Sequence, residues 1–405
     1  MKNLHSSIFK FYPTMVYIFT LKCILHNLLL IGGRKMKKRI GCLLLIILLF
    51  APYFSSNAYG ASLRVDAVSA IAIDGATGTI LFDQNAHKVI PMASTTKIIT
   101  ALVALQYGDI DREVEISKNA ASIRGSKVGY KAGEKVTIRE LLYGLMLKSG
   151  NDCAIAIAEG ISGSIPEFCE VMNEFAVSIG LVDSHFESPH GLDSTSHYSS
   201  AYDLAIATKK AKEIDEFDKI VSTKLIRDEE GIQFSREFNN INKLLYQEPN
   251  CTGVKTGYTG QAGKCLVSSF KLDGEGKNEI IVVTLNCTPR WKESQRIYEY
   301  VKENYEFKSV IKADEIIGTV NIEGKDEPLE LITEKDLIMP VKKDEDLKVE
   351  IRLPQYELKA PVSTKDTIGS ITVLNSLNSK YTMDLHPTRD IAKLSLWEKI
   401  KVVFD

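Results

Sequence analysis

The sequence predicts an α+β protein in which a domain of helices and strands precedes a small all-β domain. Apolar runs of helical length recur between residues 97 and 212. Strand-like runs follow at 252–257, 264–270 and 279–285. Short apolar alternations separated by charged turns then fill residues 308–388, so we place the domain boundary near residue 308.

Size and composition are those of an ordinary globular protein. A chain of 405 residues suffices for two or three domains, and a formal net charge of −2 predicts no nucleic-acid partner. Five cysteines follow residue 60, and they fit neither a zinc pattern nor a disulfide framework. We expect buried free thiols at Cys153, Cys169, Cys251, Cys265 and Cys287.

Residues 1–60 are predicted to be a leader. Met36 opens a basic stretch, the apolar run 42–50 follows, and small residues occupy 57–61, which is the order of a secretory signal peptide. The apolar run is short for a membrane span. Because Met36 is the better initiator, we interpret the preceding stretch from Met1 as a misplaced start, with a real extra anchor as the alternative.

The first domain is predicted over residues 62–307. Thr137, followed three residues later by Glu140, is a capping-box signature for the start of a helix. Residues 185–202 are predicted to form a long turn-rich loop, and residues 213–250 stay ambiguous. The predicted elements are a hairpin at 65–84, helices at 98–105, 137–147, 152–159, 165–179, 203–212 and 291–307, and the three strands given above.

The β-domain, residues 308–388, carries no titratable cluster, so a spacer or binding role is expected. Its strands are predicted at 317–322, 329–332, 347–351 and 371–374. Residues 389–405 then place apolar side chains on one helical stripe flanked by lysines, which favours a helix lying in a membrane surface. Docking on the β-domain is the alternative. The stripe consists of Leu394, Trp397, Ile400, Val403 and Phe404.

Ser94 and Lys97 lie three residues apart at the start of the first apolar run. Residues at this spacing share a face of a helix. A serine becomes a nucleophile when a base takes its proton, and a lysine can act as that base when burial lowers its pKa. Taken alone, the pair equally fits a helix-capping hydroxyl followed by a surface lysine.

Three motifs occur in a fixed order: Ser94-Thr95-Thr96-Lys97, Ser149-Gly150-Asn151 and Lys255-Thr256-Gly257. With these motifs the chain resembles the low-molecular-weight penicillin-binding proteins, which are serine-type D-Ala-D-Ala carboxypeptidases. The resemblance covers about residues 62–388 and implies a serine β-lactamase/transpeptidase-like domain, an antiparallel sheet flanked by helices. It extends through 91–97, 147–152, 189–193, 197–204 and 253–259.

The resemblance implies that Ser94 attacks the penultimate D-Ala, that Lys97 is the base, and that Ser149 relays the proton. Asn151 would bind the substrate amide, and the backbone N–H groups of Ser94 and Tyr258 would form an oxyanion hole. Arg290 would assist with the carboxylate or cap a surface helix. The implied substrate-binding residues are Asn151, Lys255, Thr256, Gly257, Tyr258 and Arg290.

The resemblance implies neither a metal nor another cofactor. The expected partners are peptidoglycan stem peptides, β-lactams as inhibitors, and the membrane surface through the C-terminal helix. The expected location is the outer face of the cytoplasmic membrane or the cell wall.

Two other functions remain open. A β-lactamase would need a deacylating glutamate, and Glu187 lies in the right interval, although its surroundings do not match that motif. A non-catalytic cell-wall-binding protein would rely on the β-domain and the tail. His190 and His197 could indicate a metal or a serine–histidine triad, but no matching motif accompanies them, so we interpret them as loop-packing residues.

Overall fold

The computed structural model describes residues 63–229, 231–272, 279–343, 347–375, 380–393 and 395, with the side chains of residues 229 and 232 excepted. The predicted leader and most of the predicted C-terminal helix lie outside these ranges. Within them, no helix combines the length and the apolar character needed to cross a membrane.

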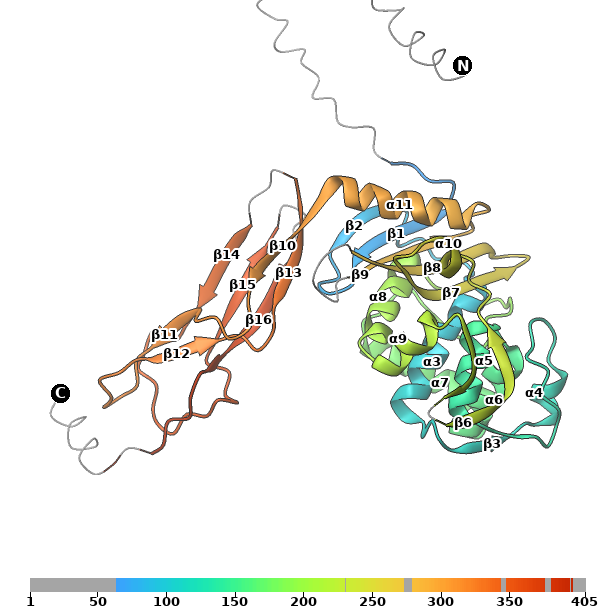
Figure 1. Cartoon of the computed structure of the whole chain (residues 1–405), viewed down its shortest axis with the longest axis horizontal. Coiled ribbons are helices and arrows are strands. Elements are labelled where there is room, and N and C mark those ends of the chain that lie inside the picture. The colour runs from blue at the N-terminus through green and yellow to red at the C-terminus, as the bar shows by residue number, and fades with distance from the viewer. Residues whose placement is uncertain are drawn as a thin grey trace, which may run out of the picture. The chain divides into compact units, whose positions relative to one another are not determined.

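A five-stranded antiparallel sheet organises the first domain (Figure 1). It confirms the predicted hairpin and the three predicted strands. Every residue of β1 and β9 is buried, because helix α11 (Arg290–Asn304) covers one face of the sheet and α8 (Ala201–Lys212) the other. The strand order is β2 (Ile80–Gln84), β1 (Ser69–Asp74), β9 (Glu279–Leu285), β8 (Gly263–Lys271), β7 (Cys251–Thr259).

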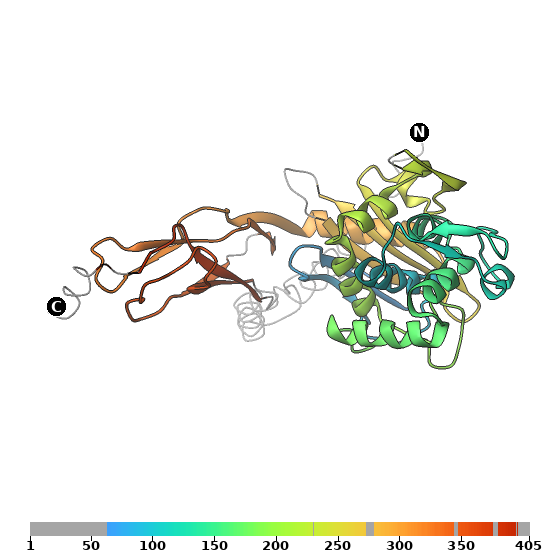
Figure 2. The same ribbon diagram turned by 90° about the horizontal axis from the view of Figure 1, so that it is seen from below.

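Most of the remaining helices gather on the α8 side of the sheet, where Figure 2 shows them in teal and green. Helix α3 is central and contacts the helices α5, α6, α7 and α8, so its residues from 97 to 104 are buried. The positions of α3, α5, α6 and α7 confirm the helices predicted at 98–105, 137–147, 152–159 and 165–179. The helices are α3 (Lys97–Tyr107), α5 (Ile138–Leu147), α6 (Asn151–Ser162), α7 (Ile165–Ser178) and α9 (Asp215–Ser222).

Of the two hydrogen bonds expected in the capping box of α5, one forms and the other does not. The Thr137 side chain accepts a hydrogen bond from the Glu140 N–H at 3.2 Å. The Glu140 carboxylate does not return to Thr137; it accepts the Tyr130 hydroxyl at 2.8 Å and the Ser235 N–H at 3.0 Å. Glu140 therefore ties the helix to two neighbouring segments.

Residues 213–250, for which the sequence supports no clear prediction, contain short helices and strands. Besides α9, it forms the hairpin β5 (Leu225–Glu229) and β6 (Ile232–Asn239), and then α10 (Leu244–Gln247). Upstream, the region between α3 and α5 holds β3 (Glu113–Glu115), α4 (Lys118–Ser122) and β4 (Lys135–Thr137).

The C-terminal part is all-β and has its own core, which includes Leu329, Leu331, Met339, Val373 and Leu385. One prediction was wrong: the helix expected to reach residue 307 ends at Asn304, because Tyr305 takes an extended conformation and begins β10. Strands β13 and β16 were not predicted. The sheets are β10 (Tyr305–Ile311) with β13 (Leu337–Lys342), and β11 (Gly318–Val320), β12 (Leu329–Ile332), β16 (Lys380–Pro387), β15 (Gly369–Leu374), β14 (Lys348–Arg352).

Candidate active site

Ser94 lies on a single 3₁₀ turn, η2 (Ala93–Thr96), that leads directly into α3. In such a turn, side chains three residues apart eclipse one another. The Lys97 Nζ accordingly lies 3.0 Å from the Ser94 Oγ. Ala93, Thr95 and Thr96 are buried, whereas Ser94 is partly exposed, so the turn presents the serine hydroxyl to solvent.

The Lys97 amine has three polar neighbours. Besides Ser94, it donates to the Asn151 Oδ1 at 2.8 Å and to the His190 backbone carbonyl at 2.7 Å. Both of these oxygens can only accept hydrogen bonds, whereas the serine hydroxyl can also donate. A neutral amine has two N–H donors and one lone pair, so this arrangement satisfies both acceptors and leaves the lone pair for the Ser94 proton.

Burial favours this neutral form. It lowers the pKa of Lys97 from 10.5 to about 7, although Cys153 and Asp152 act in the opposite direction. A base with a pKa near the working pH can both take and return a proton. Lys97 is therefore suited to general-base chemistry.

Asn151 begins α6, and a second hydrogen bond fixes the orientation of its side-chain amide. Its Nδ2 donates to the Arg124 backbone carbonyl at 2.8 Å, so its Oδ1 must face Lys97. The neighbouring Asp152 accepts the N–H groups of Val128 at 3.1 Å and Gly129 at 2.8 Å. Together the two side chains hold the loop before β4 against the site.

Ser149 lies between α5 and α6 and is 4% exposed. Its φ of +62° is in the left-handed region, which L-residues other than asparagine and aspartate rarely adopt. The next residue has no room for a side chain, because a Cβ on Gly150 would lie 2.7 Å from the Asp152 Oδ1. The turn that carries Ser149 is thus held by packing rather than by local preference.

The edge strand β7 brings the third motif to the serine turn. Lys255 is 1% exposed, its Nζ donates to the Thr256 carbonyl at 3.0 Å, and burial, then Lys97 and Arg290, lower its pKa well below 10.5. A Cβ on Gly257 would lie 3.2 Å from the Ser94 backbone nitrogen, so the missing side chain allows the close approach.

Thr256 is buried next to this contact, whereas the Tyr258 side chain is exposed at the end of β7. All three motifs therefore meet at η2, since Asn151 of the second motif bonds Lys97 and Gly257 of the third lies against the Ser94 nitrogen.

Arg290, the first residue of α11, contacts backbone oxygens. Its Nη1 donates to the Gly257 carbonyl at 2.6 Å and to the Cys265 carbonyl at 3.2 Å. The guanidinium also stacks on the Trp291 ring, 4.7 Å from its centroid. These contacts join the ends of β7 and β8, a role that the sequence did not indicate.

The long loop 185–202 contributes more than packing. The His190 carbonyl accepts from Lys97, and the Pro189 carbonyl accepts the Thr100 hydroxyl at 2.6 Å. At the other side, the Asp193 carboxylate accepts the Thr259 hydroxyl at 2.6 Å. The contributions of His190 and Pro189 are made by main-chain atoms, and the sequence carries no signal for those.

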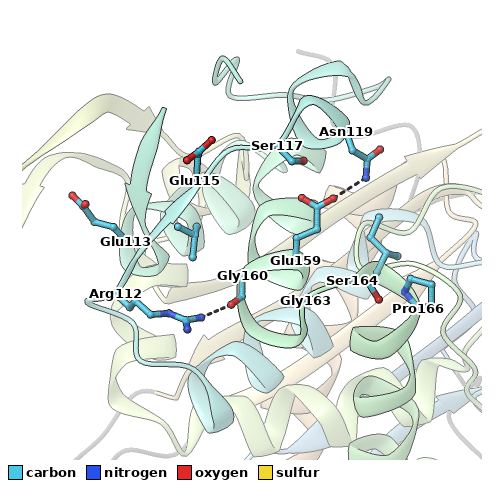
Figure 3. Close-up of a pocket in the computed structure, with 12 residues that line it drawn as sticks. Arg112, Glu113, Glu115, Ser117, Asn119, Glu159, Gly160, Gly163, Ser164 and Pro166 are labelled. Carbon is cyan, nitrogen blue, oxygen red and sulfur yellow. Dashed lines mark hydrogen bonds between the residues drawn. The ribbon is translucent and has the colours of Figure 1, made fainter. Parts of the chain in front are cut away.

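A separate pocket of about 700 Å³ lies at the far end of α6, and Figure 3 shows it. There the Asn119 side chain donates to Glu159 at 2.9 Å, and Arg112 reaches the Gly160 carbonyl. Glu159 is eight residues from Asn151, about 12 Å along the helix. None of the predicted site residues lines this pocket.

The five described cysteines are free and buried, which confirms the expectation from their spacing. Among the residues that the structure describes, no group of three histidine, cysteine, aspartate or glutamate side chains is arranged to hold a metal ion.

Comparisons with known proteins agree with this architecture. Residues 56–288 match the model of a family described as D-alanyl-D-alanine carboxypeptidase, and residues 305–393 match that of the penicillin-binding protein 5 C-terminal domain. Over 355 residues the chain is 34% identical to D-alanyl-D-alanine carboxypeptidase DacF of Bacillus subtilis, covering 84% of this chain and 90% of that protein.

Two further relatives extend the comparison. DacD of Escherichia coli is 31% identical over 76% of this chain and 82% of its own length. The crystal structure of penicillin-binding protein 5 from Haemophilus influenzae superposes with a TM-score of 0.68 at 28% identity, covering 82% of this chain and 99% of that one.

Proposed function

Because the chain belongs to the D-alanyl-D-alanine carboxypeptidase family of low-molecular-weight penicillin-binding proteins, we propose that Ser94 is the nucleophile with which it removes the terminal D-Ala of peptidoglycan stem peptides. As a member of this family the protein is a serine hydrolase. The assignment of the individual residues rests on the contacts described above.

In the first step, Lys97 takes the proton of Ser94 as the serine Oγ attacks the carbonyl carbon of the penultimate D-Ala. The observation that carries this step is the environment of the Lys97 amine, in which two oxygens accept its hydrogens and the remaining contact is the Ser94 hydroxyl. A lysine so placed needs no histidine partner.

The tetrahedral intermediate then collapses. The bond between the carbonyl carbon and the terminal D-Ala nitrogen breaks, and the departing amine receives the proton that Lys97 accepted, passed on through Ser149. Water next attacks the Ser94 ester, which releases the shortened stem peptide and restores the hydroxyl. The relay role of Ser149 rests on the family's motif and on its place in the chain, buried two residues before Asn151, whose side chain bonds the Lys97 amine.

Substrate binding is assigned to β7 and to Asn151. Lys255 and Thr256 attract the terminal carboxylate, and Asn151 binds the peptide amide. The backbone N–H groups of Ser94 and Tyr258 face the developing oxyanion, where losing one donor typically costs about 3 kcal/mol. The close approach of Gly257 to the Ser94 nitrogen supports this pairing.

Penicillin should acylate Ser94 and stay bound. Glu187, the residue that a β-lactamase reading would use for deacylation, is exposed, and its carboxylate accepts the Ser194 hydroxyl at 2.5 Å and the Ser196 N–H at 3.2 Å. Glu187 therefore stabilises the loop in which it lies. Release of bound fluorescent penicillin within seconds would favour a β-lactamase instead.

The test of the proposed function is incubation with a D-Ala-D-Ala pentapeptide and mass detection of free D-Ala. Ser94→Ala should abolish D-Ala release and the mass adduct with penicillin. Thr95→Ala is the matched control, because it removes a neighbouring hydroxyl that only bonds the Met92 carbonyl, at 2.7 Å, and it should keep the adduct. Release by Ser94→Ala at the wild-type rate would refute the assignment and favour a different site or a contaminating enzyme.

For location, we propose export to the outer face of the cytoplasmic membrane, with the C-terminal stripe lying on the membrane surface. The support is the sequence of the leader and of residues 391–404. Flotation of the full chain with anionic lipid vesicles, compared with a chain ending at residue 390, tests the attachment. Equal flotation of both chains would exclude the C-terminal segment as the anchor.

A further inference from the structure

His197 contacts the turn that carries Ser94, although it is 101 residues from Thr96 in the chain. Its side chain is 3% exposed and lies between two segments. On one side its Nδ1 accepts the Glu187 N–H at 3.0 Å, and on the other its Nε2 lies 2.8 Å from the Thr96 hydroxyl. The ring thus joins the 185–202 loop to η2.

These contacts fix the tautomer of the ring. Nδ1 accepts a hydrogen from a backbone N–H, so in the neutral ring the proton must be on Nε2. The Thr96 hydroxyl donates its own hydrogen to the Ala93 carbonyl at 2.8 Å, so it is free to accept from Nε2. The direction of every hydrogen bond from Glu187 to Ala93 is therefore determined.

The chain of hydrogen bonds ends at a strained residue. Ala93, immediately before Ser94, has a φ of +53°, a left-handed conformation that is unfavourable for an alanine. The loop approaches it so closely that a Cβ on Gly191 would lie 2.1 Å from the Ala93 oxygen. Strain of this kind persists only when the surroundings hold it.

We propose that His197 is a positioning residue: through Thr96 and the Ala93 carbonyl it holds the η2 turn in the conformation that keeps Ser94 ready for acylation. The inference rests on Ser94 being the nucleophile. It assigns His197 no contact with substrate, and it replaces our interpretation of this histidine as simple loop packing.

The electrostatic surroundings agree with a neutral ring. Burial, followed by the charges of His185 and Lys97, lowers the pKa of His197 to about 4, against the opposing effect of Glu187 and Asp193. At neutral pH the ring therefore keeps the Nδ1 lone pair that the Glu187 N–H requires.

Two substitutions of His197 test the contributions of its two ring nitrogens separately. Asn places a polar atom near the Nδ1 position and loses the contact with Thr96, whereas Gln places an amide near the Nε2 position and can still donate to Thr96. The measurement is stopped-flow acylation by a fluorescent penicillin over a range of concentrations, which yields the acylation rate constant and the dissociation constant separately.

His197→Asn should lower the acylation rate constant about 10- to 100-fold, because a misplacement of about 1 Å can cost two orders of magnitude, and should leave the dissociation constant within about twofold. His197→Gln should recover most of the rate. His185→Gln is the matched control, since His185 lies in the same loop but bonds only the Ser196 carbonyl through Nδ1, and it should acylate at the wild-type rate.

A second pair keeps the test informative if the histidine variants are unstable. Thr96→Val removes the acceptor and should slow acylation, Thr96→Ser keeps it and should not, and Thr96→Val combined with His197→Asn should be no slower than the worse single variant. Equal rates for His197→Asn and His197→Gln, or rate losses that follow the loss of thermal stability in every variant, would overturn the proposal. A wild-type chain that forms no Ser94 adduct would instead overturn the proposed function.

Discussion

The pH dependence of acylation is the sharpest consequence of the Lys97 environment. With the pKa of Lys97 lowered to about 7, half of the amine is neutral at pH 7, against about 0.03% for an ordinary lysine, a gain of roughly 1,500-fold. The base must be neutral to act, so acylation should rise with pH. Its rate at pH 5 should be about 1% of the alkaline plateau, with a midpoint near pH 7.

Asn151→Asp should move that midpoint. It would place a carboxylate on the site of the Oδ1 atom that now accepts from the Lys97 Nζ at 2.8 Å, and a negative charge at this distance stabilises the ammonium form. We expect the midpoint to rise by about one to three pH units. Asn151→Ala, which removes the acceptor without adding charge, is the control and should not raise the midpoint as far.

The assay is the acylation rate constant for a fluorescent penicillin from pH 5 to pH 10, at constant ionic strength. Reading the rate constant at saturating penicillin separates the ionisation of Lys97 from any loss of binding that the substitution at position 151 causes. A pH-independent rate in the wild type, or an unchanged midpoint in Asn151→Asp, would refute the assignment of Lys97 as the base.

Three further outcomes are expected. Lys97→Ala should abolish D-Ala release and adduct formation while its circular dichroism stays that of the wild type; release at more than a few per cent of the wild-type rate would contradict the role of the amine. The free energy of unfolding should fall by about 1.6 kcal/mol between pH 6.5 and 5 through His197 alone, because its pKa is about 4 in the folded protein and 6.5 when unfolded, so the unfolded state binds the extra proton as pH falls; urea unfolding of wild type and His197→Gln at both pH values measures it, and an equal loss of unfolding free energy in the two proteins would contradict it. Gly257→Ala should slow acylation at least tenfold, because its Cβ would lie 3.0 Å from the Met92 carbonyl and 3.2 Å from the Ser94 nitrogen; a wild-type rate constant would show that β7 can move away without consequence.

Side-chain chemistry was largely predictable, and main-chain chemistry was not. The spacing of Ser94 and Lys97 predicted their contact, and the structure places the two atoms 3.0 Å apart. The sequence could not show that the amine also donates to the His190 carbonyl, because every residue has a carbonyl and only the fold decides which one arrives. The left-handed backbone at Ser149 is hidden for a similar reason, since serine has no preference for it.

The missed strands have different causes. Strand β13 contains Pro340, which lacks a backbone N–H donor, so the sequence argues against a strand there. The proline is tolerated because β13 pairs on one side only, with β10, where Pro340 lies opposite Phe307. Strand β16 does carry a signal in the sequence: Tyr381, Met383 and Leu385 alternate with exposed residues, which is the period of two expected of a strand.

The five cysteine thiols in the described part of the chain are enclosed, so they can report on transient opening of the fold. Cys153 lies in α6 against Gly144 of α5, next to the segment that carries Ser149, and it is fully shielded. An aromatic disulfide reagent can reach such a sulfur only when the two helices part, so its labelling rate would measure how often that part of the molecule opens. Acylation by penicillin should slow the labelling if occupancy of the site restrains the opening.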